Sequence, residues 1–178
     1  MRLFRSSIET PIGQMVTLVS DEALCALEFA GRGRLTRLEA RLDRWYAPYT
    51  IVHGANEVTV QTRAWLGEYF AGASAGMSAP TGLAIDARGA PFELRVWRAL
   101  GDIPAGTTST YGAIAKQLGS AGASRAVGLA NGANPLAILV PCHRVIGSNG
   151  TLTGYGGGLE KKRWLLDHER RWAGGQLF

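Results

Sequence analysis

The chain has 178 residues, of which 46% are hydrophobic, and carries 19 Lys and Arg against 14 Asp and Glu, a formal net charge of +5. This length and apolar fraction suffice for a packed core and exclude an intrinsically disordered protein. No apolar run reaches the roughly 18 residues that span a bilayer, and the first twenty residues lack the apolar core of a signal peptide. We therefore expect a cytoplasmic protein with no membrane contact.

Residues 1–88 are predicted to form an N-terminal α/β domain in which a small antiparallel sheet is combined with helices. Short stretches with a rough apolar period of two predict strands at 11–19 and 23–30, and Leu83-Ala84-Ile85 is expected to be a last strand of this domain. Apolar residues at helical spacing predict helices at 33–46 and 57–71. The inward side of the second helix is expected to comprise Val60, Ala64, Tyr69 and Phe70.

The sequence Gly89-Ala90-Pro91 marks the boundary to a second domain, 89–178, which is predicted to be mainly helical. Pro, Thr and Gly at helix starts and stops predict helices at 91–101, 111–118, 123–132 and 159–171. The second and third of these helices, with the short turn between them, have the helix-turn-helix pattern. The apolar run at 136–140 predicts a buried strand. The exposed side of the last helix is expected to carry Lys161, Lys162, Arg163, Arg170 and Arg171.

The positive charge is concentrated in the second domain. Residues 1–88 hold nine Arg and nine Asp and Glu, whereas residues 89–178 hold ten Lys and Arg against five Asp and Glu. A basic half beside a neutral half suggests an anionic partner such as nucleic acid. Chance clustering is the alternative that charge alone leaves open.

Cys142 is the first candidate for chemistry. It follows a buried run and Pro141 and precedes His143 and Arg144. Because arginine is costly to bury, the chain is expected to reach the surface at Arg144. Neighbouring cations lower the pKa of a thiol and increase its nucleophilic thiolate form. Since adjacent residues of an extended segment point in opposite directions, a water is expected to connect His143 with the sulfur. A lone free cysteine is otherwise more often inert packing.

Four further features could serve a function. Arg125 lies in a helix of small residues that can approach a partner closely, and Asn134-Pro135 forms a hinge between elements. The loop Gly154–Gly158 carries a single aromatic residue, Tyr155, and Glu169 could orient an imidazole. Taken singly, a solvated arginine, an ordinary turn, a glycine connector and a surface carboxylate explain them equally well.

Together, and in this order, these features resemble the O6-alkylguanine-DNA alkyltransferases, also called the methylated-DNA–protein-cysteine methyltransferase family. The sequence Pro-Cys-His-Arg-Val at 141–145 is similar to the family's active-site motif, and 124–128 to its recognition helix. The remaining matches are the active-site tyrosine, the asparagine hinge, the substrate loop and the acidic partner of the histidine, at Tyr111, Asn134, Gly154–Gly158 and Glu169. The resemblance implies an RNase H-like N-terminal domain and a winged-helix-like, DNA-binding and alkyl-accepting C-terminal domain.

The resemblance also implies direct DNA repair. An alkyl group on O6 of guanine, or on O4 of thymine, would be transferred irreversibly to Cys142 in a single turnover. His143, held by Glu169, would deprotonate the thiol through a water. Tyr111 would donate a hydrogen bond or proton to the leaving guanine, and Asn134 would hold the hinge and the network on the tyrosine side in place.

The implied partner is double-stranded DNA containing O6-alkylguanine, bound in its minor groove by the helix-turn-helix. Arg125 would fill the gap that the flipped base leaves in the stack. The expected DNA contacts are Thr107, Tyr111, Ser124, Arg125, Ala126 and Gly128. The expected substrate pocket comprises Val145, Tyr155, Gly156 and Gly157. The resemblance implies no cofactor and no metal ion in the transfer, and a monomeric protein; cooperative binding along DNA is left open.

Two other functions compete with this interpretation. A non-catalytic helix-turn-helix protein would bind alkylated DNA without chemistry and would have no special need of Cys142. A cysteine hydrolase using Cys142 and His143 would turn over repeatedly and would need an oxyanion site, which the sequence does not indicate.

Overall fold

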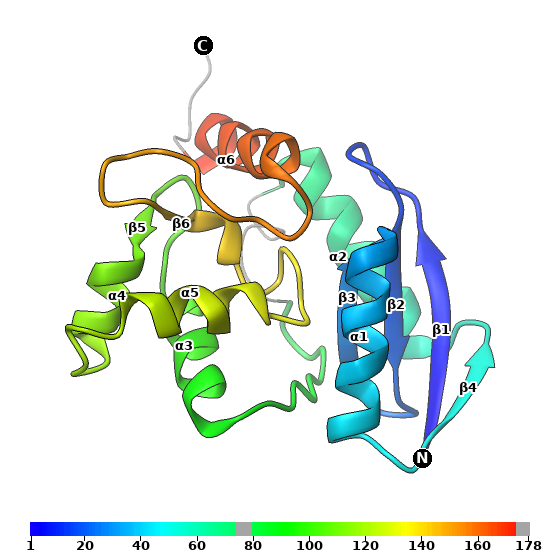
Figure 1. The fold of residues 1–178 in the computed structure, drawn as a ribbon. Helices are drawn as coiled ribbons and strands as arrows, with labels where there is room; N and C mark the ends of the chain where they lie inside the picture. Colours follow the sequence, from blue (N-terminus) through cyan, green and yellow to red (C-terminus); the bar gives the residue numbers. More distant parts are fainter. Residues whose placement is uncertain (74–79, 174–178) are drawn as a thin grey trace. The chain divides into compact units, whose positions relative to one another are not determined.

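A computed structural model describes residues 1–73 and 80–173. The chain divides into two compact units, Met1–Gly89 and Ala90–Phe178, each of which is described by itself. The predicted boundary, after residue 88, lies one residue earlier. The first unit is built around a sheet and the second mainly from helices (Figure 1), so the expected mixed α+β fold is confirmed. Within the described ranges, no helix has the length and apolar character needed to cross a membrane.

The first unit contains a four-stranded sheet in the order β3-β2-β1-β4. Its strands are β1 (Arg2–Ile8), β2 (Met15–Val19), β3 (Leu24–Phe29) and β4 (Thr50–His53). The pairs β1–β2 and β2–β3 are antiparallel, but β4 runs parallel to β1. The expected small antiparallel sheet is therefore present, with one parallel edge strand that was not predicted. Strands β1 and β4 were missed because β1 mixes Arg and Ser with apolar residues and the short edge strand β4 is exposed throughout, so neither gave a strand signal.

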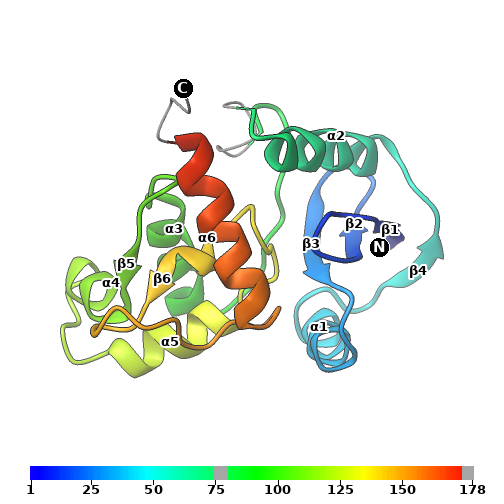
Figure 2. The same ribbon diagram turned by 90° about the horizontal axis from the view of Figure 1, so that it is seen from above.

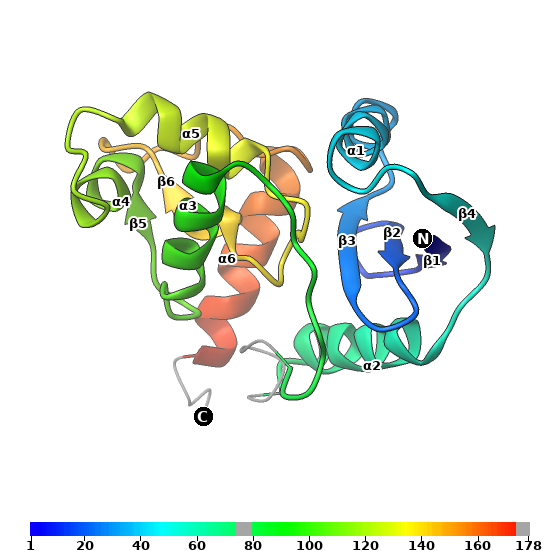
Figure 3. The same cartoon turned by 90° about the horizontal axis from the view of Figure 1, so that it is seen from below.

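Two helices cover this sheet, one on each face (Figures 2 and 3). They are α1 (Arg32–Trp45) and α2 (Glu57–Ala71), within one residue of the predicted bounds. Coverage on both faces explains why every residue of β2 and β3 is buried. The expected strand at 83–85 is reduced to a single bridge between Ile85 and Leu24.

The buried side of α2 differs from the prediction. Val60 is 57% exposed and Ala64 is exposed, whereas Tyr69 is buried as expected. The buried residues of this helix are Val58, Thr59, Thr62, Trp65, Leu66 and Tyr69. Threonine misled the prediction because its hydroxyl can bond within the helix: Oγ1 of Thr62 donates to the carbonyl oxygen of Val58 at 2.8 Å.

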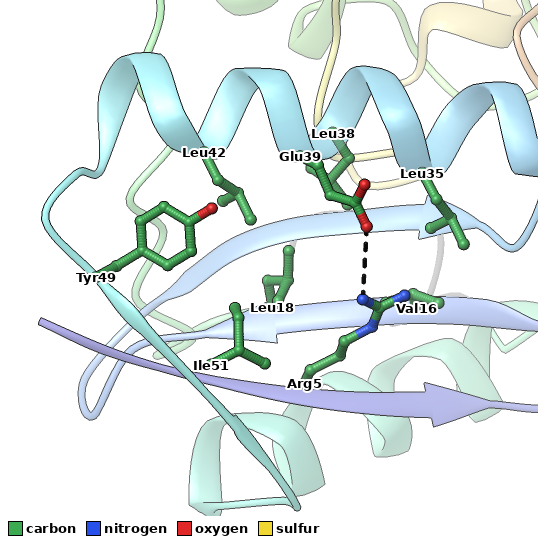
Figure 4. Close-up of a pocket in the computed structure, with 9 residues that line it drawn as sticks. All are labelled: Arg5, Val16, Leu18, Leu35, Leu38, Glu39, Leu42, Tyr49 and Ile51. Atoms are coloured by element: carbon green, nitrogen blue, oxygen red, sulfur yellow. Dashed lines mark ion pairs between the residues drawn. The ribbon is translucent and has the colours of Figure 1, made fainter.

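A small cavity of about 70 Å³ lies between α1 and the sheet (Figure 4). Its walls are mainly leucine and other apolar side chains, and an ion pair between Arg5 and Glu39, 3.8 Å apart, joins strand and helix beside it. A gap lined this way is an ordinary packing void beneath an amphipathic helix. We therefore assign it to the core of the first unit rather than to a ligand site.

The second unit begins with three mutually packed helices, α3 (Pro91–Gly101), α4 (Tyr111–Gln117) and α5 (Ser124–Gly132). Buried Trp97 of α3 joins α5 by donating from Nε1 to the carbonyl oxygen of Ala130 at 2.8 Å. Helices α4 and α5 form the predicted helix-turn-helix. Thr110 caps the N-terminus of α4, and Gly119, with a positive φ of 73°, follows its C-terminal end. The last described element is α6 (Leu159–Ala173), and β5 (Ser109–Thr110) pairs in parallel with β6 (Val145–Ile146).

The run at 136–140 is a buried turn and not the predicted strand. Ile138 adopts φ 71°, which a strand cannot accommodate, and the amide of Val140 donates to the carbonyl oxygen of Leu136 at 2.9 Å. A short apolar run shows that a segment is buried but does not determine its backbone conformation.

Candidate active site

Cys142 lies in a short 3-10 helix, Cys142–Arg144, immediately before β6. An extended segment was predicted here, and that prediction is wrong. All three of its side chains are buried, including that of Arg144, so the expectation that the chain reaches the surface there is wrong. The parallel pairing of β6 with β5 places Thr110 beside Ile146, and Tyr111, the residue after Thr110, is close enough to Cys142 for a charge on the sulfur to raise its pKa.

Glu169 explains how this segment can be buried. Its Oε1 accepts from His143 Nε2 at 2.7 Å, and its two oxygens accept from Arg144 Nε and Nη2 at 2.9 Å each. Burial by itself would raise the pKa of Glu169, but the hydrogen bonds and charges of His143 and Arg144 outweigh it and hold the pKa well below its ordinary value. Glu169 is thus an ionised carboxylate that balances the buried guanidinium.

His143 is arranged as a neutral base. Complete burial lowers the pKa of its imidazole, against the opposing effect of Glu169. Because an ionised carboxylate can only accept hydrogen bonds, Nε2 carries the hydrogen and Nδ1 has the lone pair. Nδ1 is buried and has no hydrogen-bond partner within residues 1–73 and 80–173. The imidazole of the residue next to Cys142 therefore has one nitrogen available to accept a proton.

Lys162 is a member of this site that the sequence analysis placed wrongly on the exposed side of α6. Its side chain is fully buried, and Nζ donates to the carbonyl oxygens of Val145 at 2.5 Å and Thr153 at 2.7 Å. Burial lowers the pKa of Lys162 to about 8, and the charge of an ionised Cys142 opposes this shift. Helical spacing could have revealed the burial of Lys162, because this residue shares the inner face of α6 with Leu165, Leu166 and Glu169.

Tyr111, the first residue of α4, contacts both α5 and the segment that leads into the loop Gly154–Gly158. Its hydroxyl donates to the carbonyl oxygen of Thr153, 3.5 Å away, and a Cβ on Gly128 of α5 would lie 3.8 Å from its ring. Burial raises the pKa of Tyr111; the hydrogen bond to Thr153 opposes this, and a charge on Cys142 adds to it. The phenol therefore stays protonated at neutral pH and is available as a donor.

Asn134 holds the turn that precedes Cys142. Its Nδ2 donates to the carbonyl oxygen of Val140 at 2.8 Å, and its Oδ1 accepts from the amide of Leu136 at 2.9 Å. The side chain is buried. The part of the chain that the structure describes shows no hydrogen bond from Asn134 to Tyr111. Asn134 thus acts on the backbone of the Cys142 segment, rather than on the tyrosine side that was also expected.

The remaining predicted site residues lie in two regions, the helix-turn-helix and the expected substrate pocket. On the helix-turn-helix, Arg125 and Ala126 are exposed, while Ser124 and Gly128 are half-buried; exposed Thr107 lies in the preceding turn. In the pocket region, Val145 is buried, Tyr155 and Gly157 are half-buried and Gly156 is exposed. The hydrogen bond from Lys162 to Thr153 ties the start of this loop to Val145. Within the described ranges, no group of three or more His, Cys, Asp or Glu could hold a metal ion.

Comparison with known proteins decides the family. A sequence model described as "6-O-methylguanine DNA methyltransferase, DNA binding domain" matches residues 91–171. The methylated-DNA–protein-cysteine methyltransferase of Mycolicibacterium paratuberculosis is 47% identical over 157 residues, which cover 85% of this chain and 90% of the relative. This chain belongs to the methylated-DNA–protein-cysteine methyltransferase family.

Solved structures of this methyltransferase family agree over nearly the whole chain. The crystal structure of Mycobacterium tuberculosis O6-methylguanine methyltransferase, 40% identical, has a TM-score of 0.78 and covers 98% of this chain and 96% of its own. The structure of Mycobacterium tuberculosis OGT in complex with DNA, also 40% identical, has a TM-score of 0.75 and covers 96% of this chain and 94% of its own. The resemblance inferred from the motifs is therefore confirmed, as is the fold class.

Proposed function

We propose that this chain repairs DNA directly, by transferring an alkyl group from O6 of guanine to Sγ of its own Cys142 in one irreversible turnover. The observation that carries the proposal is the buried hydrogen bond between His143 Nε2 and Glu169 Oε1, which leaves Nδ1 of His143, the residue after Cys142 in the chain, with its lone pair available. A protein that only binds DNA would need Glu169 to balance Arg144, but it would not need a neutral imidazole with an available lone pair next to a cysteine. We extend the proposed substrates to O4-alkylthymine because it presents the same kind of alkylated oxygen.

The proposed transfer begins when Nδ1 of His143 takes the thiol proton of Cys142, through a bridging water. The thiolate attacks the alkyl carbon, a new C–S bond forms, and the bond from that carbon to O6 breaks. Its electron pair remains on the guanine, which Tyr111 stabilises by donating a hydrogen bond or its proton. Because a thioether is a very poor leaving group, nothing restores the thiol, and each molecule reacts once.

The proposed substrate is double-stranded DNA, bound by the helix-turn-helix in the minor groove with the damaged base flipped out. Arg125 is exposed on α5, whose other exposed side chains are mostly small, so it would enter the stack and fill the gap. Ser124, Ala126, Gly128 and Thr107 would line the approach to the DNA. The relative from Mycobacterium tuberculosis whose structure is described as a complex with DNA supports this choice of partner. We further propose that the protein acts as a monomer.

The flipped base would be received by the glycine loop. Val145 and the residues Tyr155, Gly156 and Gly157 would surround it, with the position of the loop secured through Lys162 and Thr153. Asn134 would keep the Cys142 segment in place from the other side. In this arrangement the chain's own residues supply the acceptor, the base and the proton donor.

Mass spectrometry of the Cys142 peptide tests the chemistry. After incubation with O6-methylguanine duplex DNA, the peptide should gain one methyl group, with at most one equivalent of DNA repaired per protein molecule. A Cys142→Ala variant should bind the DNA and repair none of it. Binding without any change to the wild-type peptide would favour the non-catalytic binder, and repair beyond one equivalent would favour a hydrolase.

The role of Arg125 is tested by comparing two substrates. Arg125→Ala should slow repair of duplex DNA while leaving the reaction with the free base O6-benzylguanine unchanged, because only the duplex requires flipping. Arg163→Ala removes an exposed arginine from α6 and serves as the matched control. Equal loss on both substrates would rule out the base-flipping role.

A further inference from the structure

Leu129 of α5 is 72% exposed, more than any other large hydrophobic side chain within residues 1–73 and 80–173. The residues that fix α5 to its neighbours are Val127, Ala130 and Asn131, which are buried on another side of the helix. A leucine that remains in water adds little hydrophobic stabilisation, and alanine is the better helix former. Folding of the second unit therefore does not explain a leucine at this position.

Leu129 shares its side of α5 with Arg125, which precedes it by one helical turn and is also exposed. Ala126 between them is exposed too, and a Cβ on Gly122 or Gly132 would meet nothing within 4 Å. Leu129 and Arg125 are thus two long side chains rising from a surface of small residues. Such a surface allows a partner to approach the helix closely on both sides of them.

The charge pattern indicates which partner fits this surface. No Asp or Glu occurs between Asp102 and Glu160, a segment that includes both helices of the helix-turn-helix, whereas exposed Lys116 and Arg125 lie within it. A surface without carboxylates is complementary to a polyanion. DNA combines phosphate charge with apolar sugar and base edges, and proteins bound in its minor groove often use apolar side chains there.

We propose that Leu129 is a DNA-contacting residue that packs against the apolar sugar and base edges of the minor groove, one helical turn from Arg125. The inference rests on the proposed function, which it deepens by assigning a second anchoring side chain on α5. Four residues of helix rise about 6 Å. Two base-pair steps rise about 7 Å, so Leu129 and Arg125 can engage different steps of the duplex. Because the contact is apolar, its contribution to affinity is insensitive to salt.

Binding of a duplex oligonucleotide tests the proposal. Leu129→Ala is expected to weaken affinity about tenfold, the effect of losing most of the apolar contact of one leucine. Leu129→Gln, which is of comparable size but polar, should weaken it similarly, whereas Leu129→Met should bind like the wild type. The slope of log affinity against log salt should be the same for all three variants, since no phosphate contact is lost. Leu94→Ala, the same change at an exposed position of α3, should have no effect.

Reaction with free O6-benzylguanine separates this proposal from a structural role. Leu129→Ala should react with the free base at the wild-type rate and should retain the wild-type melting temperature. Wild-type affinity for DNA in Leu129→Ala, or an equal loss on the free base, would overturn the proposal. Failure of the proposed function is visible separately, because the wild-type Cys142 peptide would then gain no methyl group from alkylated DNA.

Discussion

Arg144 and Glu169 form a buried, bidentate ion pair, with Nε to Oε2 and Nη2 to Oε1 both at 2.9 Å. The same Oε1 accepts from His143 Nε2. One carboxylate thus balances a buried guanidinium and orients the imidazole beside Cys142. The stability of the second unit and the proposed chemistry of its cysteine are therefore expected to depend on the same residue of α6.

Replacing Glu169 by glutamine should lower the stability of the second unit and slow the reaction of Cys142. The variant keeps the shape of the side chain but leaves the buried charge of Arg144 uncompensated, which should lower the free energy of unfolding by about 3 kcal/mol. It also no longer fixes the hydrogen of His143 on Nε2, so methylation of Cys142 should slow about 100-fold, the lower range of what a positioned base contributes. Urea unfolding and single-turnover kinetics measure these effects. Glu160→Gln, at an exposed acid of the same helix, should change neither.

Acid should destabilise the protein in two stages. The pKa of His143 lies below its ordinary 6.5 in the folded state, and that of Glu169 lies below 4.5. Below each ordinary value the unfolded chain binds the extra proton first, so the free energy of unfolding falls as the pH drops below about 6.5 and falls further below about 4.5. Unfolding measured at a series of pH values should show this, and His143→Gln should flatten the upper stage. An unchanged upper stage in that variant would show that other groups cause it.

Lys162→Met should loosen the site. Methionine fills the volume but leaves the carbonyl oxygens of Val145 and Thr153 without their donor, which should cost about 2 kcal/mol at neutral pH and slow the transfer. The pKa of Lys162 is lowered from 10.5 to about 8, so between these values the unfolded chain binds more protons and wild-type stability gains a contribution that rises with pH. Lys162→Met should lose that contribution, whereas Arg163→Met, at the exposed neighbour, should retain it. A variant as stable and reactive as the wild type would contradict the assigned role.

Gly128 offers a test of the contact with Tyr111. A Cβ at this position would lie 3.8 Å from the tyrosine ring, an ordinary contact distance, so Gly128→Ala should be accommodated. It should stabilise α5 by about 0.5–1 kcal/mol through helix propensity, without slowing the reaction with the free base O6-benzylguanine. Gly128→Leu should displace Tyr111 and slow the reaction. Gly132→Ala is the control: its Cβ would meet nothing within 4 Å, so this variant measures how much a methyl group on α5 changes stability when it does not contact Tyr111.

Much of the helical structure was predictable because its signals are local. The bounds of α2 and α3 match the prediction: Asn56 accepts from the amide of Thr59 at the start of α2, and Pro91 occupies the first turn of α3. Caps and turns involve residues a few positions apart, so their effect is visible in the chain itself. The parallel pairing of β4 with β1 involves residues nearly fifty positions apart and left no such signal.

In the candidate site, too, local sequence features were predictable and contacts between distant segments were not. Its motif residues Cys142, His143 and Glu169 were recognised from their order in the chain, and the order of the motifs also indicated the family. The burial of Arg144 and Lys162 was not recognised, because arginine and lysine are ordinarily exposed.

The sequence by itself thus determined the family, the residue types of the site and the helices that carry them. Only the tertiary structure decided which charges are buried. Arg144 is stabilised by a carboxylate 25 residues away, and Lys162 by carbonyl groups 17 and 9 residues before it. A charge leaves water only when partners from other segments replace its hydration, and those partners meet only in the folded chain.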